Sequence, residues 1–189
     1  VLTFVSGVLI ARVLGPSARA EYGSVLLVAQ TFVALCSLSF FDGAIVRIRE
    51  CPSSLVGALS ALIVVSIGLS LLAIALFVWL LPFLDLGLPS ITSDQLILFV
   101  AVLTLVNLLT DAFNAYERSK MQFFLVNLAK VTNPGMFSIL LLITWVVDGD
   151  GLSVYFVLLL CLASKSPFLG IWFLRYRDNF WVRPHPGFV

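Results

Sequence analysis

Charged residues are scarce in this sequence, since Asp, Glu, Lys and Arg together make up 11% of its 189 residues. A soluble domain typically has about 25%, so the composition excludes an ordinary water-soluble fold. The net charge of +1 leaves no basic excess that would favour nucleic acid as a partner. Histidine occurs once, as His185, and the three cysteines have no CxxC spacing, so the sequence indicates neither a metal site nor a disulfide.

Apolar residues, in contrast, are abundant: they make up 61% of the chain and include 16 Phe. A helix that crosses about 30 Å of hydrocarbon needs roughly 20 apolar residues. We therefore predict an all-α, polytopic membrane helix bundle with about six transmembrane helices and no extramembrane domain. The predicted spans are residues 1–11, 23–41, 55–84, 95–113, 123–147 and 152–174, and residues 175–189 form a basic juxtamembrane tail.

The start of the chain is unusual for a membrane protein. Its first apolar run covers only about half of a span, and the sequence opens on Val1 with no Met and no positively charged flank. A cleaved signal peptide would need a charged start and a small-residue cleavage site, and neither is visible. We expect the chain to be a fragment of a longer protein.

Loop charges indicate an orientation. If the first span begins in the cytoplasm, the inner loops carry seven basic residues and the outer loops carry two, in agreement with the positive-inside rule. The inner residues are Arg47, Arg49, Arg118, Lys120, Arg175, Arg177 and Arg183, and the outer ones are Arg12 and Arg19. We expect both ends of the chain in the cytoplasm, with residues 85–94 and 148–151 outside.

Arg12 and Arg19 flank Gly15 and Pro16 on the side that should be poor in basic residues. One interpretation is that the two arginines decorate a tight outer turn that Gly15 and Pro16 create. The other is that Arg12 faces a water-filled cavity and attracts an anion, because its planar guanidinium binds phosphate oxygens in pairs. The sequence leaves both interpretations open.

The stretch ARVLGPSARAEYGSVLLVAQTFVAL, followed by FFDGAIVRIRE, resembles the start of the polysaccharide-biosynthesis flippases. These are the O-antigen transporters within the multidrug/oligosaccharidyl-lipid/polysaccharide exporter superfamily. Their Arg-x-Leu-Gly-Pro turn corresponds to residues 12–16, and the Tyr-Gly that opens their second helix corresponds to Tyr22-Gly23. Their following Arg corresponds to Arg47, after Asp42-Gly43. The later stretch NAYERSKMQFFLVNLAKVTNPGMF is similar to the polar loop that leads into the family's fifth helix.

This resemblance implies the N-terminal lobe of a two-lobe exporter in the cell (inner/plasma) membrane. Such a protein moves a saccharide linked to a polyprenyl pyrophosphate across the lipid bilayer by alternating access, without breaking a bond. Its partners would be that lipid-linked saccharide, the bilayer and a second lobe of the same protein. A single lobe cannot close a two-sided pathway, so we expect the 189 residues alone to be inactive.

The fourth predicted span carries a polar stripe. Its residues Thr104, Asn107, Asp111 and Asn114 are spaced by three, four and three positions, so they share one face of a helix. Such a stripe can line a cavity, or it can form hydrogen bonds that only hold the helices together.

Two lysines also lie inside predicted spans. Lys130 is close enough to the inner end of the fifth span to extend its ammonium to the interface, or to pair with Asp111. Lys165 is near mid-membrane, where a charge costs about 2.5–3.5 kcal/mol on insertion scales. The remaining interpretation is a basic cavity that receives a pyrophosphate, with Arg12, Lys130 and Lys165 at successive depths.

The sequence thus predicts a transporter with a candidate substrate cavity and no catalytic or metal-binding residue. The candidate cavity residues are Arg12, Arg47, Asn107, Asp111, Lys130 and Lys165. One alternative is a membrane-embedded scaffold or assembly subunit, since polar stripes also serve helix association. A weaker one is an envelope-lipid transferase. The chain has no HExxH or Gly-x-Ser-x-Gly sequence, and Asp111 is the only acid within the predicted spans, so we expect no enzyme activity and no cofactor.

Overall fold

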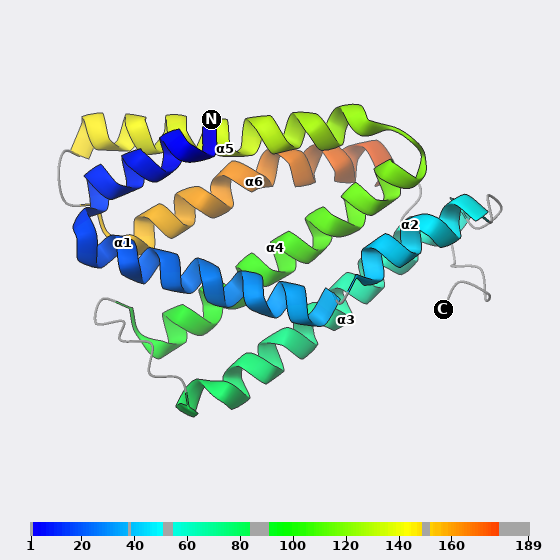
Figure 1. Cartoon of the computed structure of the whole chain (residues 1–189), viewed down its shortest axis with the longest axis horizontal. Helices are drawn as coiled ribbons and strands as arrows, with labels where there is room; N and C mark the ends of the chain where they lie inside the picture. The colour runs from blue at the N-terminus through cyan, green and yellow to red at the C-terminus, as the bar shows by residue number, and fades with distance from the viewer. Residues whose placement is uncertain (1, 38, 51–54, 84–90, 149–151, 178–189) are drawn as a thin grey trace.

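A computed structural model describes the chain except for residues 1, 38, 51–54, 84–90, 149–151 and 178–189. The described residues form an all-α bundle, which confirms the predicted fold class (Figure 1). Its elements are α1 (Leu2–Ser37), α2 (Phe40–Glu50), α3 (Leu55–Leu80), the short 3-10 helix η2 (Leu81–Phe83), α4 (Ser93–Ser119), α5 (Phe123–Asp148) and α6 (Val154–Tyr176). Arg183, His185 and most of both predicted outer loops lie outside the described residues.

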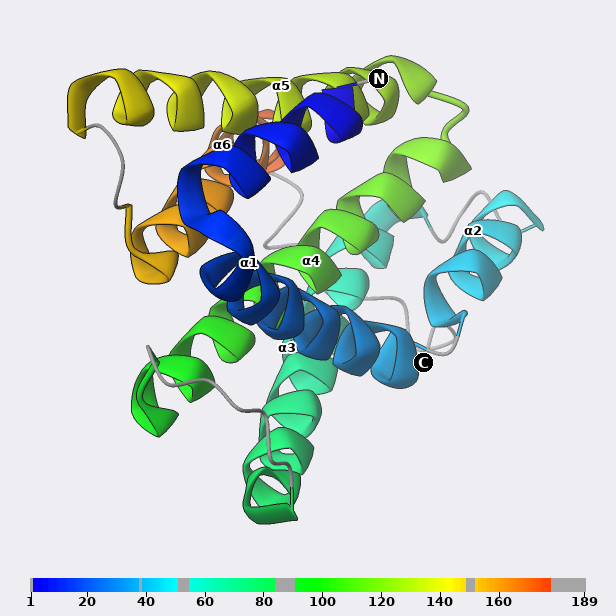
Figure 2. The ribbon, with the colours of Figure 1, turned by 60° about the vertical axis from the view of Figure 1, so that its left-hand side comes forward.

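A sharp bend divides α1 into two halves, as Figures 1 and 2 both show. At the bend Gly15 has φ 70° and ψ 177°, a backbone conformation that is open essentially only to glycine. Pro16 follows, and proline suits the first position of a helix because its missing N–H needs no partner there. The turn predicted at these two residues is therefore present. The second half of α1 begins directly after it rather than at Gly23.

The helix ends gather at two opposite ends of the molecule. The bend of α1, the end of α5 and the starts of α4 and α6 lie towards the left of Figure 1, and we call this the bend end. The ends of α4 and α6, the start of α5 and all of α2 lie towards the right. We call this the basic end, because its described residues include Arg47, Arg49, Arg118, Lys120, Arg175 and Arg177.

The helix α2 was not among the predicted elements. It buries Phe41, Ala44 and Ile48, at helical spacing, in an apolar cluster that includes α4 residues, while most of its other side chains are exposed. The Arg49 guanidinium donates a hydrogen bond of 2.7 Å to the carbonyl of Arg118 near the end of α4. A cation is favourable at a helix C-terminus, so this bond holds α2 across the basic end.

The helix α4 is at the centre of the bundle and packs against α1, α2, α3, α5 and α6. A capping box starts it, in which Thr92 accepts from the Gln95 amide and the Gln95 side chain accepts from the Thr92 amide. Instead of ending near Phe113, α4 continues to Ser119. The last turns of α4 therefore carry polar residues for which the sequence pattern predicted a loop.

Two apolar clusters hold the bundle together. The cluster nearer the bend end includes Tyr22, Phe77, Phe99, Leu141 and Leu158. The cluster nearer the basic end joins α2, α3, α4 and α6, with the Phe113 and Trp172 rings stacked at a centroid distance of 5.2 Å. In lipid such contacts stabilise by close packing rather than by removal from water. On α4, Asn107 comes in sequence between these clusters, whereas Asp111 and Asn114 alternate with residues of the second.

Candidate functional site

A polar groove opens between α1, α2 and α4. It consists of two cavities of about 360 Å³ and 460 Å³ that share Ala34, Ser37 and Asp111. The first cavity is lined by Gln30, Val33, Ala34, Ser37, Asn107, Thr110 and Asp111. The second, nearer α2, is lined by Ala34, Ser37, Ser39, Phe41, Asp42, Ile45, Asp111, Asn114, Ala115 and Arg118. Three of the four residues in the predicted polar stripe therefore line one surface; the fourth, Thr104, is fully buried beyond it.

Lys165 on α6 contacts a residue of this surface, although it is not one of the residues that line either cavity. Its Nζ donates a hydrogen bond of 2.5 Å to Oδ1 of Asn107, and the lysine is half-buried. One turn further along α4, the Asp111 carboxylate interacts electrostatically with Lys165 and with Arg118. Because a charge at this depth is costly in lipid, the lysine is stabilised by an amide and a carboxylate from a neighbouring helix.

The groove carries both signs of charge. Asp42 lies on the exposed side of α2 and lines the second cavity together with Arg118. Asp111 lines both cavities, so the lining has two carboxylates and one cation among neutral hydrogen-bonding groups, and Lys165 lies beside Asp111. The surface is therefore polar and carries charges of both signs.

Four of the predicted site residues do not line the groove, namely Lys165, which contacts it through Asn107, and Arg12, Arg47 and Lys130. Arg12 is exposed just before the bend at Gly15, Lys130 is exposed on α5, and Arg47 is exposed on α2. The groove runs along α4, and the first half of α1 and helix α5 contribute none of its lining residues. Within the described part of the chain no ion pair links Lys130 to Asp111, and Lys165 is the lysine beside that carboxylate.

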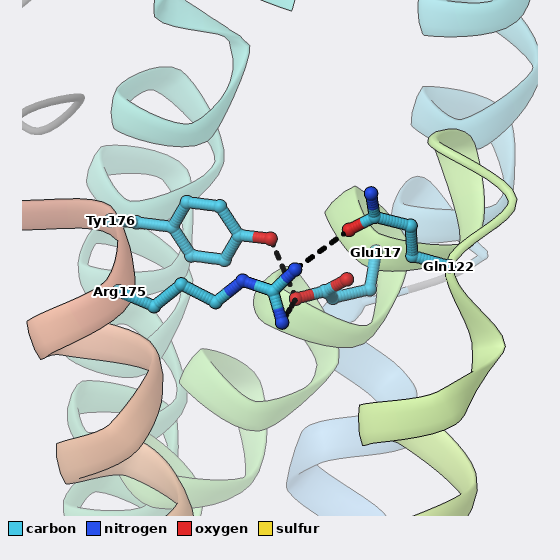
Figure 3. Close-up of polar contacts among 4 residues, drawn as sticks. All are labelled: Glu117, Gln122, Arg175 and Tyr176. Atoms are coloured by element: carbon cyan, nitrogen blue, oxygen red, sulfur yellow. Dashed lines mark hydrogen bonds and ion pairs between the residues drawn. The ribbon is translucent and has the colours of Figure 1, made fainter.

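A second polar cluster lies at the basic end, where the sequence pattern predicted a loop. Glu117 is fully buried at the end of α4, so Asp111 is not the only acid within a span. Its Oε1 accepts a hydrogen bond of 2.7 Å from the Tyr176 hydroxyl and lies 3.9 Å from an Arg175 nitrogen. Arg175 also donates to Oε1 of Gln122 at 3.0 Å. Figure 3 shows these four side chains, which we call the Glu117 cluster.

The Glu117 cluster joins α4, α6 and the turn before α5, and the turn is itself tightly closed. The Gln122 amide donates to the Glu117 carbonyl at 3.0 Å, and Met121 adopts a positive φ of 58°. Glu117 is three positions after Asn114, the last residue of the polar stripe. Extending the spacing of the stripe beyond the predicted helix end at Phe113 would therefore have placed Glu117 on the helix. The partners on α6, however, are more than fifty positions away, and only the tertiary fold brings them together.

Helix length and hydropathy define the class of protein. Five helices of the described chain are long and apolar enough to cross a membrane, namely Ser6–Ser37, Gly57–Phe83, Ser93–Ser119, Phe123–Val147 and Val154–Tyr176. The chain is thus a multi-pass membrane protein. Among its described residues, no group of three His, Cys, Asp or Glu side chains could hold a metal ion.

Comparisons with family models, with curated proteins and with solved structures found no match to this chain. The resemblance to the saccharide flippases therefore stays a hypothesis carried by the quoted residues.

Proposed function

We propose that the chain belongs to a membrane transporter that moves a polyprenyl-pyrophosphate-linked saccharide across the cell membrane. The observation that carries this proposal is the lysine near the middle of α6, Lys165, bonded to Asn107 on the wall of an open polar groove. Ionisable groups inside membrane spans typically mark substrate or ion pathways. The quoted family resemblance supplies the substrate class.

The groove chemistry suits a hydroxyl-rich and phosphorylated headgroup. The side chains of Gln30, Asn107 and Asn114 offer amide donors and acceptors for saccharide hydroxyls. Lys165 and Arg118 offer cationic donors for phosphate oxygens. The polyprenyl chain needs no polar partner and stays in the lipid.

The packing is consistent with one state of an alternating-access cycle. The polar groove is lined by the parts of α1 and α4 that run to the basic end, and by α2. Towards the bend end the same helices pack through Tyr22, Phe99 and Leu103 in the apolar cluster. In this proposal the bundle opens at the basic end and closes at the bend end, and a second lobe provides the facing wall.

The proposed orientation puts the basic end in the cytoplasm, because cytoplasmic loops are rich in Arg and Lys. Single cysteines test it in a variant without the native cysteines. A membrane-impermeant thiol reagent added outside intact cells should label Asp94→Cys, which is exposed at the bend end. It should label Glu50→Cys, exposed at the end of α2, only after permeabilisation. The reverse pattern would overturn the orientation.

The scaffold alternative also has an observation in its favour. Polar side chains join helices elsewhere in the bundle, as where the Ser6 and Ser138 hydroxyls meet at 2.8 Å between α1 and α5. On this alternative the Lys165–Asn107 bond is one more contact between helices, and its loss would lower stability without a specific effect on transport.

A transport assay separates the two functions, using the complete reading frame that encodes this chain. Proteoliposomes containing a labelled polyprenyl-pyrophosphate saccharide would report flipping by Lys165→Met and, as a charge-loss control outside the groove, Arg19→Met. We expect Lys165→Met to slow flipping about tenfold or more, which is ~1.4 kcal/mol. Arg19 is exposed and away from the groove, so Arg19→Met should flip at the unmodified rate.

Stability measured in parallel excludes unfolding as the cause. Removing the lysine charge relieves about 2.5–3.5 kcal/mol of insertion cost, but it also removes a hydrogen bond between membrane helices, worth about 0.6–1.7 kcal/mol, and the cation beside Asp111. Because these effects oppose one another, we expect Lys165→Met to be about as stable as the unmodified protein. Normal flipping by this variant would contradict the transport proposal, and a loss of stability would favour the scaffold.

A further inference from the structure

A third cavity, of about 480 Å³, opens at the basic end beside the turn between α4 and α5. Its lining consists of Glu117, Met121, Gln122, Phe123, Phe124, Leu125 and Arg175. None of these residues lines the polar groove, so the cavity is a separate surface. It combines two opposite charges with a largely apolar wall.

The negative charge of this cavity is incompletely satisfied. Glu117 is 0% exposed, and while its Oε1 accepts from Tyr176, its Oε2 has no hydrogen-bond partner among the described residues. In Figure 3 this second oxygen points away from Tyr176, on the side of Gln122. A buried carboxylate oxygen without a donor is costly, so a ligand with an N–H donor and a positive charge would satisfy it.

The positive charge lies beside it and is accessible. The Arg175 side chain is 43% exposed. Its guanidinium has five N–H donors, so donors remain after the bond to Gln122. The first turn of α5 begins at Phe123, and the free amides at a helix N-terminus also favour an anion. An anionic group therefore fits at Arg175, a few ångströms from the carboxylate that favours a cation.

The remaining wall is apolar and faces outward. Phe124 is 75% exposed and Met121 is 63% exposed, and Phe123 is exposed beside them at the start of a membrane span. Such side chains at the end of a span lie where acyl chains meet lipid headgroups. Met121 has a flexible side chain, so it can move aside to let a headgroup reach Glu117.

We propose that this cavity binds the headgroup of phosphatidylethanolamine. The primary ammonium donates to Oε2 of Glu117, the phosphate accepts from Arg175, and an acyl chain lies along Phe123 and Phe124. Phosphatidylcholine fits poorly, because its quaternary ammonium has no N–H to donate. Phosphatidylglycerol fits poorly, because it brings no cation to the buried carboxylate.

Native mass spectrometry of the full 189-residue chain tests this selectivity. The chain is released from micelles that contain equal amounts of the three lipids, and the lipids retained per chain are counted. We expect phosphatidylethanolamine to be retained with about tenfold preference over each of the others, equivalent to ~1.4 kcal/mol. Equal retention of the three lipids by the unmodified chain would overturn the proposal without recourse to any variant.

Two variants and a soluble competitor test whether the lipid preference arises at this cavity. Glu117→Gln keeps the side-chain shape and removes the charge, so the preference over phosphatidylcholine should disappear. Arg177→Ala, which removes a nearby charge that does not line the cavity, should keep it. A preference unchanged in Glu117→Gln would overturn the site. Displacement by free phosphoethanolamine at the lipid's own concentration would show that the acyl chain contributes nothing, and would overturn the lipid assignment.

Discussion

Replacing Gly15 by alanine should destabilise the protein through backbone strain alone. At φ 70° and ψ 177° this residue has a conformation that L side chains rarely adopt. A Cβ atom built at Gly15 meets nothing within 4 Å, so no steric clash contributes. Holding a non-glycine residue in such a region costs about 1–3 kcal/mol, and that is the destabilisation we expect for Gly15→Ala.

Gly23→Ala is the matched control, because Gly23 lies in the second half of the same helix. Its Cβ position is also free of neighbours within 4 Å, and its φ is not positive. Alanine in a helix interior is more favourable than glycine by about 0.5–1 kcal/mol, so this control should be slightly stabilised. The two variants should then differ by roughly 1.5–4 kcal/mol, the sum of the two effects.

Unfolding of both variants can be followed by far-ultraviolet circular dichroism as the fraction of denaturing detergent in mixed micelles is raised. The midpoint should fall for Gly15→Ala and stay or rise for Gly23→Ala. Equal midpoints would refute the argument that the bend requires glycine, and α1 would then be a helix that passes through residue 15 without strain.

Two further predictions concern contacts between helices. Tyr176→Phe removes the hydroxyl that donates to Glu117 and leaves a buried carboxylate without that partner, so it should cost about 1–3 kcal/mol. Tyr155→Phe, at an exposed tyrosine, should change stability by less than about 0.5 kcal/mol in the same unfolding assay. A double-mutant cycle of Ser6→Ala and Ser138→Ala should give a coupling of about 0.6 kcal/mol and no more than about 1.7 kcal/mol, and zero coupling would show that their hydrogen bond does not stabilise the bundle.

Much of the fold could be predicted because a local run of residues determines each of these helices. Apolar runs of the length of a membrane span predicted α3 to α6, and the Gly15-Pro16 pair predicted the bend of α1. The polar stripe on α4 followed from helical periodicity, and the structure places Asn107, Asp111 and Asn114 on the groove. These features depend on residues within a few turns of one another.

The features that could not be predicted depend on distant contacts. Glu117 is in a polar stretch whose composition is typical of a loop. Its partners in the buried position, Tyr176 and Arg175, are on another helix. The helix α2 contains Asp42, Arg47 and Arg49 and is too short to span a membrane, and it is ordered by packing against α4. Arginine commonly binds anions, but Arg12 lies just before the bend, where it is exposed and away from the groove.

The most direct test of the central claim, that the polar groove binds the transported headgroup, is substrate protection of a single cysteine within it. Thr110 lines the groove, and its hydroxyl donates to the Val106 carbonyl of its own helix, so Thr110→Cys should fold normally. In the complete protein without native cysteines, a polyprenyl-pyrophosphate-linked saccharide should slow thiol labelling of Thr110→Cys and leave Glu50→Cys, outside the groove, unchanged. Equal labelling rates of Thr110→Cys with and without a saturating amount of the saccharide would contradict the claim.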